Sequence, residues 1–424
     1  MFSKTAIAAL SLAYSGSVFA GSCVQELNYQ QDLRVPALET WATDSLLGGD
    51  GSAEVECRMT QKLSDLFVFV QEKIATESTP NRKLRGTHAK GLCLNGTYQS
   101  QLAATLSDAQ KAALKQAGLF GSDDKMAARF RFANASSRIS PDWNADVRAL
   151  SIKVALPAGG EQDFAFNNVP RFQLDSLDNF VNLLEMQKGM FTGKIAVDAK
   201  TGAPSPVSLF NYFVELQGVA KATTTLYHLN NIKTMSAEDT KWEASYAQQN
   251  YWSTTAFGVG RDAENVVKFG AMPCSADGQV AKRSSDLTRA ELLSEAAAQS
   301  LADSLVKSGA VTRAENYLSE SLVTQLKDGP VCYDLFVQFL NAEESVGGRL
   351  NSDRARELVE NPSLVWNGPI HVVGQMLMNE AVDQRTCDDP ASAVSVIANS
   401  SEIYGLGQIN RAREFSEGAS RKNR

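Results

Sequence analysis

The chain has 424 residues, of which 43% are hydrophobic, and a formal net charge of −7 at pH 7. This is the composition of an ordinary globular protein, long enough to bury a large core. A mildly acidic chain without a concentrated basic arm is a poor candidate for nucleic-acid binding, and the basic end at 411–424 is the local exception.

Residues 1–20 have the layout of a secretory signal peptide. Lys4 precedes an apolar run, and the small-residue ending Val18-Phe19-Ala20 predicts cleavage after Ala20. The apolar run is too short to span a bilayer, and no later segment approaches a spanning length. We therefore expect a periplasmic or secreted protein without a membrane span.

The six cysteines form an even set, which in an oxidising compartment indicates disulfides. The sequence leaves their connectivity open. Neither a CxxC nor an HxxH spacing occurs, so a structural zinc site is not expected.

The pattern along the chain predicts an α+β fold with strands grouped in the middle and helices before, between and after them. An N-terminal helical segment at 21–81 precedes one domain at 82–424. Helices are expected at 106–120, 176–249, 287–328 and 406–424. Strands are expected at 84–100, 128–136, 147–156, 161–174, 251–260, 265–273, 332–342 and 368–379.

Three segments carry candidate functional groups, and each has a plain structural alternative. His88 lies between Arg85 and Lys90 in RGTHAKG, where a lone histidine is more often a buried residue with a backbone partner. The amides of Asn167 and Asn168 offer donors to an anionic or peroxidic oxygen, or belong to a turn before a proline. The tail at 410–424 also reads as a solvated helix with weak ion pairs.

Taken in chain order, these segments resemble the catalase superfamily, in its smaller catalase-related branch. The matching stretches are RGTHAKG, RFANAS, DVRALSIKV, DFAFNNVPRF and RAREFSEGASRKNR. The resemblance extends from about residue 82 to the end. It implies an antiparallel β-barrel surrounded by helices, with heme bound at its side.

The resemblance assigns roles to residues of this chain. It makes His88 the distal residue that takes a proton from peroxide, and Asn167 the amide that hydrogen-bonds the peroxide oxygens. It makes Arg413 the residue that polarises the proximal iron ligand. The remaining carried-over residues face the heme, as propionate partners (Arg85, Arg131, Arg424) or as aromatic lining (Phe172, Phe180).

The chain departs from the family pattern at the proximal ligand. The position four after Arg413 holds a tyrosine in the family and Glu417 here, so the resemblance makes Glu417 an unusual iron ligand. Ala133 and Ala149 replace a serine and a glycine of the pattern. Thr87 replaces an aliphatic residue, which resembles the branch that acts on fatty-acid hydroperoxides; its alternative is an ordinary β-branched strand residue.

Two functions are compatible with these residues. The first is an exported heme protein that acts on hydrogen peroxide or on organic hydroperoxides, including lipid hydroperoxides. The second is a non-catalytic binding or structural protein on a catalase scaffold that has lost its proximal heme ligand. A buried Glu417 favours the first, and a Glu417 paired with Arg413 or Arg421 in solvent favours the second. The sequence leaves the oligomeric state open.

Overall fold

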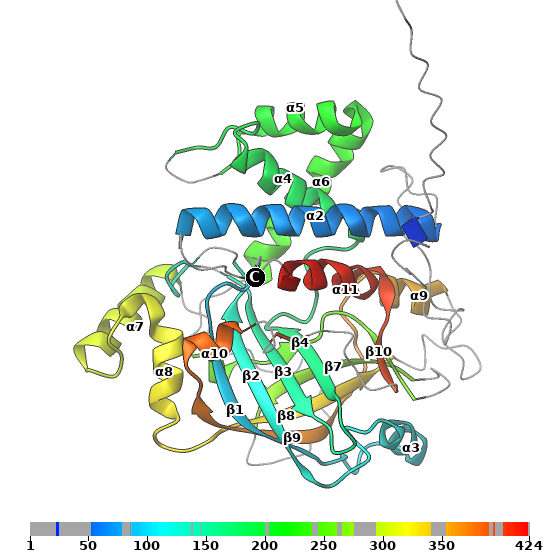
Figure 1. Ribbon diagram of the computed structural model, residues 1–424, viewed down its shortest axis with the longest axis vertical. Coiled ribbons are helices and arrows are strands. Elements are labelled where there is room, and N and C mark those ends of the chain that lie inside the picture. Colours follow the sequence, from blue (N-terminus) through cyan, green and yellow to red (C-terminus); the bar gives the residue numbers. More distant parts are fainter. Residues whose placement is uncertain are drawn as a thin grey trace, which may run out of the picture.

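The structure is a computed structural model (Figure 1). It describes residues 23–24, 52–78, 85, 87–136, 139–144, 146–199, 203–239, 245–260, 265–274, 294–340, 353–389, 393–394 and 402–422. The predicted signal peptide at 1–20 lies outside these residues, as does most of the predicted helical segment before position 52.

The described elements follow the α+β pattern that the sequence predicts. The helices are α2 (Ala53–Ser78), α3 (Asp108–Gln116), α4 (Leu177–Phe191), α5 (Pro206–Gln217), α6 (Val219–Asp239), α7 (Glu295–Lys307), α8 (Tyr317–Gln325), α9 (Asp353–Glu360), α10 (Gln384–Asp388) and α11 (Gly407–Lys422). The strands are β1 (Gly91–Ser100), β2 (Lys125–Asn134), β3 (Arg148–Ala155), β4 (Glu161–Asn167), β5 (Tyr251–Trp252), β6 (Phe257–Val259), β7 (Asn265–Pro273), β8 (Val331–Phe339), β9 (Ile370–Ala381) and β10 (Ile403–Gly405).

Eight of the strands close into an antiparallel barrel, as the resemblance implies. The sheet runs in the order β7-β5-β4-β3-β2-β1-β9-β8, and β8 pairs with β7 to close it. The short strands β6 and β10 extend the sheet beside β7. Closure gives each of these eight strands a partner on both sides, and the shortest contact is the single pair of Asn167 on β4 with Trp252 on β5.

The barrel interior is filled by aromatic side chains. Along β2, Phe130 and Phe132 are fully buried in the main core cluster, and the alternate positions Arg129 and Arg131 lie on the other face. Gly374 on β9 makes room for one of the rings, because a Cβ there would lie 2.3 Å from Cε2 of Tyr98.

One end of the barrel is covered by helices. Figure 1 shows α11 between the barrel and the long helix α2, with α4, α5 and α6 above α2. A buried charge cluster joins this layer: Arg411 on α11 contacts Glu56 on α2 at 2.7 Å and Glu360 at the end of α9 at 3.3 Å. These ion pairs fix α11 against its neighbours.

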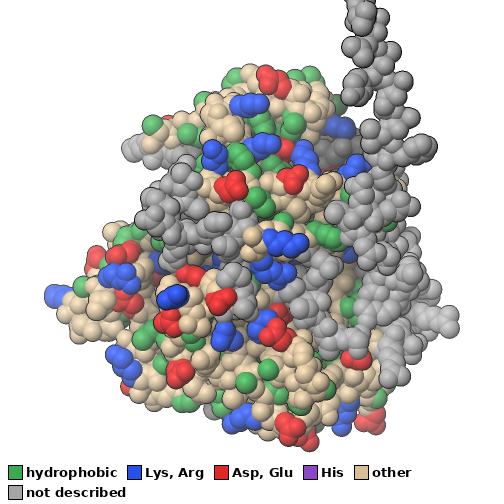
Figure 2. Space-filling view, viewed as in Figure 1, with side chains coloured by type: hydrophobic (Ala, Val, Ile, Leu, Met, Phe, Trp, Pro, Cys, Tyr) green, Lys and Arg blue, Asp and Glu red, His purple; other side chains and the backbone are tan. Residues whose placement is uncertain are grey.

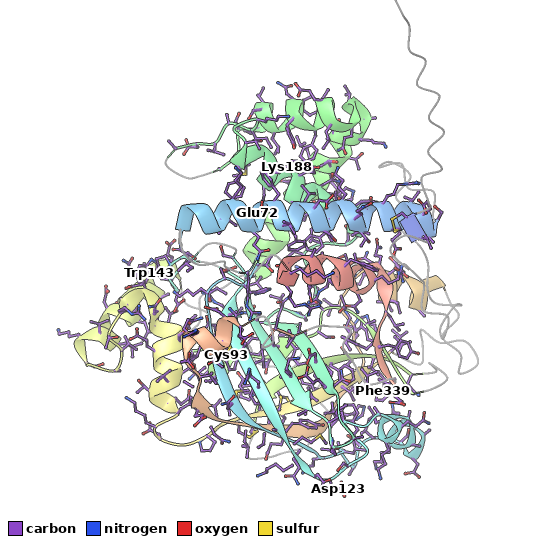
Figure 3. The ribbon with its side chains drawn as sticks, viewed as in Figure 1. Glu72, Cys93, Asp123, Trp143, Lys188 and Phe339 are labelled. Atoms are coloured by element: carbon purple, nitrogen blue, oxygen red, sulfur yellow. A yellow bond between two sulfur atoms is a disulfide. The ribbon has the colours of Figure 1, made fainter. Side chains whose placement is uncertain are left out.

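Three disulfides pair all six cysteines. They join Cys23 to Cys57, Cys93 to Cys387, and Cys274 to Cys332. The Cys93–Cys387 bond ties β1 to α10 (Figure 3). The structure thus gives the connectivity that the cysteine spacing alone left open.

The main difference from the sequence prediction lies before β1. A strand was expected over 84–100, but β1 begins at Gly91, and the segment carrying Thr87 and His88 is not a strand. The reason is the backbone of His88, which adopts a left-handed conformation with φ of 56° that a strand cannot contain.

The exterior is unremarkable in charge and hydropathy. On the face shown in Figure 2, acidic and basic side chains are interspersed. Among the described helices, none combines the length and the hydrophobicity that crossing a membrane requires.

Candidate functional site

The candidate residues gather at the barrel end that faces α11. The strands are antiparallel, so the start of β1, the end of β2, the start of β3 and the end of β4 meet at one rim. His88 lies just before β1, and Asn167 is the last residue of β4. Two of the candidate residues, 79 positions apart in sequence, thus lie at the same rim.

The backbone at His88 is strained and is held in place from several sides. A left-handed conformation is uncommon for a residue other than glycine and is retained only where the surroundings impose it. The amide of His88 donates to the carbonyl of Ala135 at 3.2 Å, and the guanidinium of Arg131 donates to the carbonyl of His88 at 2.7 Å. Gly91 accommodates that guanidinium, since a Cβ there would lie 2.7 Å from Cζ of Arg131.

The imidazole of His88 is held neutral. Desolvation, together with the positive charges of Arg131, Arg413 and Arg85, lowers the pKa of His88 to about 3. Nδ1 is enclosed and makes no hydrogen bond, although the main-chain carbonyl of Asn134 lies by the ring and partly opposes the shift. A neutral imidazole surrounded by three cations is a base without a competing proton, and its surroundings attract an anionic ligand.

Asn167 and Asn168 have different surroundings. Asn168 is buried; its Oδ1 accepts from the amide of Arg148 at 2.8 Å, and its Nδ2 donates to Gln249 at 2.8 Å. The side chain of Asn167 makes no hydrogen bond with the part of the chain that the structure describes. Asn168 therefore has the structural role, and the Asn167 amide remains available to a ligand.

Arg413 and Glu417 form an ion pair along α11. Nε of Arg413 donates to Oε1 of Glu417 at 2.9 Å, and the two side chains are 21% and 31% exposed. The pair is therefore only half-buried, between the two situations that the sequence analysis distinguished. Because Arg413 also acts on His88, α11 brings the pair to the same rim.

The other predicted ligand contacts are distributed around this rim. Arg85 donates to the carbonyl of Cys387 at 3.1 Å, beside the Cys93–Cys387 disulfide. Thr87 makes no side-chain hydrogen bond among the described residues. Arg424 lies outside the described residues.

The two predicted lining aromatics pack together among the helices α2, α4 and α11. The rings of Phe172 and Phe180 meet edge to face at 5.9 Å, and Phe180 also contacts Phe67 on α2 at 5.4 Å. They belong to an apolar cluster that includes Ile409 and Ala412 of α11. The cluster supports the helix that carries Arg413 and Glu417.

Asp142 belongs to the same end of the barrel and was missed by sequence reasoning. It lies in the stretch SPDWNAD, which the composition indicates to be a plain turn. In the structure it is fully buried and accepts from Nζ of Lys90 at 2.7 Å and from Nδ2 of Asn134 at 3.1 Å. The only local sequence signal was Lys90, which follows His88 by two residues. It does not indicate that the carboxylate partner of Lys90 lies 52 positions away.

Acidification is expected to destabilise the fold through His88. The unfolded chain binds a proton on this imidazole near pH 6.5, whereas the folded protein does so only near pH 3. The free energy of unfolding therefore falls as pH decreases through this window, by at most about 1.4 kcal/mol per pH unit, and His88 has no such effect above it. Urea titrations of the wild type and His88→Gln at pH 7 and pH 5 measure the difference; equal pH dependence in both would contradict it.

Solved structures to which this chain is similar in fold include catalases. The chain is similar to catalase A from Saccharomyces cerevisiae, with a TM-score of 0.53 and 14% identity over 81% of this chain and 62% of that one. It is also similar to a fungal catalase (TM-score 0.50, 17% identity, 78% of this chain and 57% of that one) and to a bacterial catalase (0.52, 16%, 84% and 60%). The chain has the catalase fold.

The catalase fold is shown here by structure and not by sequence. No family model matches the sequence, and no curated protein matches it. The chain spans about three-fifths of the length of the catalases to which it is similar. The catalase fold accounts for the closed barrel and the covering helices, while the chemistry of the rim depends on this chain's own residues.

Proposed function

We propose that this chain is an exported heme protein that consumes hydrogen peroxide or an organic hydroperoxide. The observation that carries the proposal is the convergence of Arg85, Arg131 and Arg413 on the neutral His88 at one end of a barrel with the catalase fold. The predicted signal peptide and the three disulfides support export, because disulfides persist in oxidising compartments.

The donor set of the rim fits heme. Heme carries two carboxylates, which arginines pair with strongly, and its iron binds oxygen ligands. Arg85 and Arg131 would hold the carboxylates, and Glu417 would supply an oxygen ligand beside Arg413, whose guanidinium already donates to it. The enclosed, unpartnered Nδ1 of His88 is a further mark of a site arranged for chemistry rather than for packing.

Heme, when bound, supplies the iron that reacts with the peroxide oxygen–oxygen bond. His88 accepts the proton of the incoming hydroperoxide, because its imidazole is neutral at every physiological pH. Asn167 offers an amide donor to the peroxide oxygens, since its side chain is not used within the described fold. Arg131 holds the carbonyl of His88 and so maintains the position of the imidazole.

The decisive experiment removes the axial carboxylate. Glu417→Ala is expected to weaken heme binding by more than about tenfold, since even residues that merely support a metal ligand cost 10- to 100-fold in affinity. The readouts are heme titration of the purified protein, the Soret absorbance and a pyridine hemochrome assay. Glu54→Ala is the matched control, because Glu54 makes the same i,i+4 ion pair with Arg58 on α2 at 3.1 Å and is similarly exposed.

The alternative function is a non-catalytic binding or structural protein on the same fold. The observation in its favour is that the Glu417 carboxylate is already paired with Arg413. A protein that takes up no heme after reconstitution would overturn the peroxide proposal and leave this alternative. Stoichiometric heme that Glu417→Ala displaces would overturn the alternative.

A further inference from the structure

A buried polar cluster stands directly behind His88. It comprises Lys90, Asn134 and Asp142, each at most 9% exposed. Oδ1 of Asp142 accepts from Nζ of Lys90 at 2.7 Å and from Nδ2 of Asn134 at 3.1 Å, and Oδ2 accepts from the amide of Leu318 in the first turn of α8 at 2.9 Å. One carboxylate thus joins three segments of the chain.

Two of those segments, the one with Lys90 and the one with Asn134, lie next to His88. Lys90 follows His88 by two residues, and its Nζ also donates to the carbonyl of Ser140 at 2.9 Å, so this end of the segment is fixed. Asn134 contributes the main-chain carbonyl beside the imidazole. The amide of Asn134 donates to the carbonyl of Lys90 at 3.0 Å, which locks the two segments together.

The same carboxyl residue reaches the strand end that carries Asn167. The main-chain carbonyl of Asp142 accepts from Nη2 of Arg148 at 2.8 Å, and the amide of Arg148 donates to Oδ1 of Asn168 at 2.8 Å. Figure 3 shows Trp143, the residue after Asp142, on the α7 side of the barrel. Asp142 is therefore placed between the two candidate catalytic residues without touching either.

Such a cluster is costly to bury, so its position calls for an explanation. Two buried charges lose their hydration, and an apolar replacement of the pair is often as stable or more stable. The pair therefore adds little to stability beyond what packing would provide. What it supplies is orientation, because its hydrogen bonds with Lys90 and Asn134 fix neighbours of His88, and its hydrogen bond with Arg148 lies beside the end of β4.

We propose that Asp142 is a positioning residue for His88: through Lys90 and Asn134 it holds the strained backbone of His88 and keeps the Asn134 carbonyl against the imidazole. A carbonyl only accepts hydrogen bonds, so its place beside the ring favours one neutral tautomer, with the proton on the ring nitrogen nearer the carbonyl and the lone pair on the other. That lone pair is the one a base presents to a substrate. The catalytic part of this inference rests on the proposed function; the effect on the imidazole does not.

The test is an NMR measurement of the histidine tautomers in the protein without cofactor. The chain has only three histidines, so with 15N-labelled imidazoles His88 is assigned by comparison with His228→Gln and His371→Gln. We expect a single neutral tautomer of His88 to predominate in the wild type. In Asp142→Asn and in the neutral pair Lys90→Met/Asp142→Asn, we expect that signature to be lost to a mixture of tautomers, with His228 and His371 unchanged.

The matched control is Lys153→Met. It removes a cation that pairs with the buried Asp163 at 3.1 Å, a similar ion pair on β3 and β4, and it is expected to leave His88 unchanged. Lys90→Arg, which keeps the charge, is expected to retain the wild-type tautomer in a larger fraction of molecules than Lys90→Met. The double variant serves where Asp142→Asn alone does not fold, since it leaves no unpaired buried charge.

The outcomes separate positioning from structure and from the proposed function. A folded double variant with an unchanged His88 spectrum overturns the proposal, and so does a double variant that does not fold, because the role of Asp142 is then purely structural. A change at His88 that Lys153→Met reproduces also overturns it. Failure of heme titration would overturn the proposed function while leaving this result intact, since no cofactor is present in the measurement.

Discussion

His88→Gln is expected to lower the peroxide turnover of the heme-loaded protein by about 10²- to 10⁴-fold, the usual contribution of a positioned general base. Glutamine places a polar amide of similar size where the imidazole was, but an amide does not act as a base. Heme affinity is expected to change little, because the role proposed for His88 is to face the peroxide and not to hold the cofactor. Stopped-flow peroxide consumption together with heme titration measures both quantities on the same sample.

The control for this prediction is His371→Gln. His371, on β9, also has a lowered pKa, but the cause is burial and not the charge of an arginine. Its Nδ1 and Oγ1 of Thr105 form a hydrogen bond of 2.8 Å. Its replacement is expected to leave turnover unchanged. Equal turnover in wild type and His88→Gln would remove His88 from the mechanism and favour the non-catalytic alternative.

Arg411→Met is expected to destabilise the protein by about 3–5 kcal/mol, the cost of leaving buried charges without their partner. The substitution removes the guanidinium that pairs with Glu56, which is fully buried, and with Glu360, which is nearly so. Urea or thermal unfolding measures the loss. The pH dependence is a second readout, because the two carboxylates then bind protons more readily in the folded state, and the variant loses less of its stability on acidification than the wild type.

Arg413→Met, two positions further along α11, is the comparison. It breaks the half-exposed i,i+4 pair with Glu417, a class of pair that contributes about 0.3–0.5 kcal/mol. A loss for Arg411→Met as small as that for Arg413→Met would show that the charge cluster does not hold α11 in place. The comparison also distinguishes Arg411, which holds α11 in place, from Arg413, which α11 brings to the candidate site.

The barrel was predictable from the sequence because its strands carry their own signal. The alternation in ARFRFANAS survives in β2, where Phe130 and Phe132 fill the barrel and Arg129 and Arg131 lie on the other face. The alternation in VRALSIKVAL survives in β3, where Leu150, Ile152 and Val154 belong to the same core. The terminal helix was predictable for the same reason, and α11 falls within its expected range. These elements form where their local periodicity predicts them, because their tertiary contacts favour the same secondary structure.

The candidate site was only partly predictable, since its decisive features are tertiary. The left-handed backbone of His88 depends on a hydrogen bond that it donates to the carbonyl of Ala135 and on one that it accepts from Arg131, and no local sequence pattern predicts either. Asp142 was invisible because turn residues rich in Asp, Asn and Pro are ordinary, and only folding brings this one to Lys90. The sequence did not reveal Asp142 because its partner Lys90 lies 52 positions away.

The closure of the barrel imposes an order on how this chain folds. β1, the first strand, pairs on one side with β9, the ninth, and the disulfide beside that seam joins cysteines 294 positions apart. A chain that emerges amino-terminus first therefore presents the open edge of β1, and the thiol of Cys93, long before their partners exist. Cys23 and Cys57 are made earlier and are available to pair wrongly with Cys93 in that interval. Because so long a loop closes slowly, we expect correct oxidation, rather than the stability of the finished barrel, to limit the recovery of native protein.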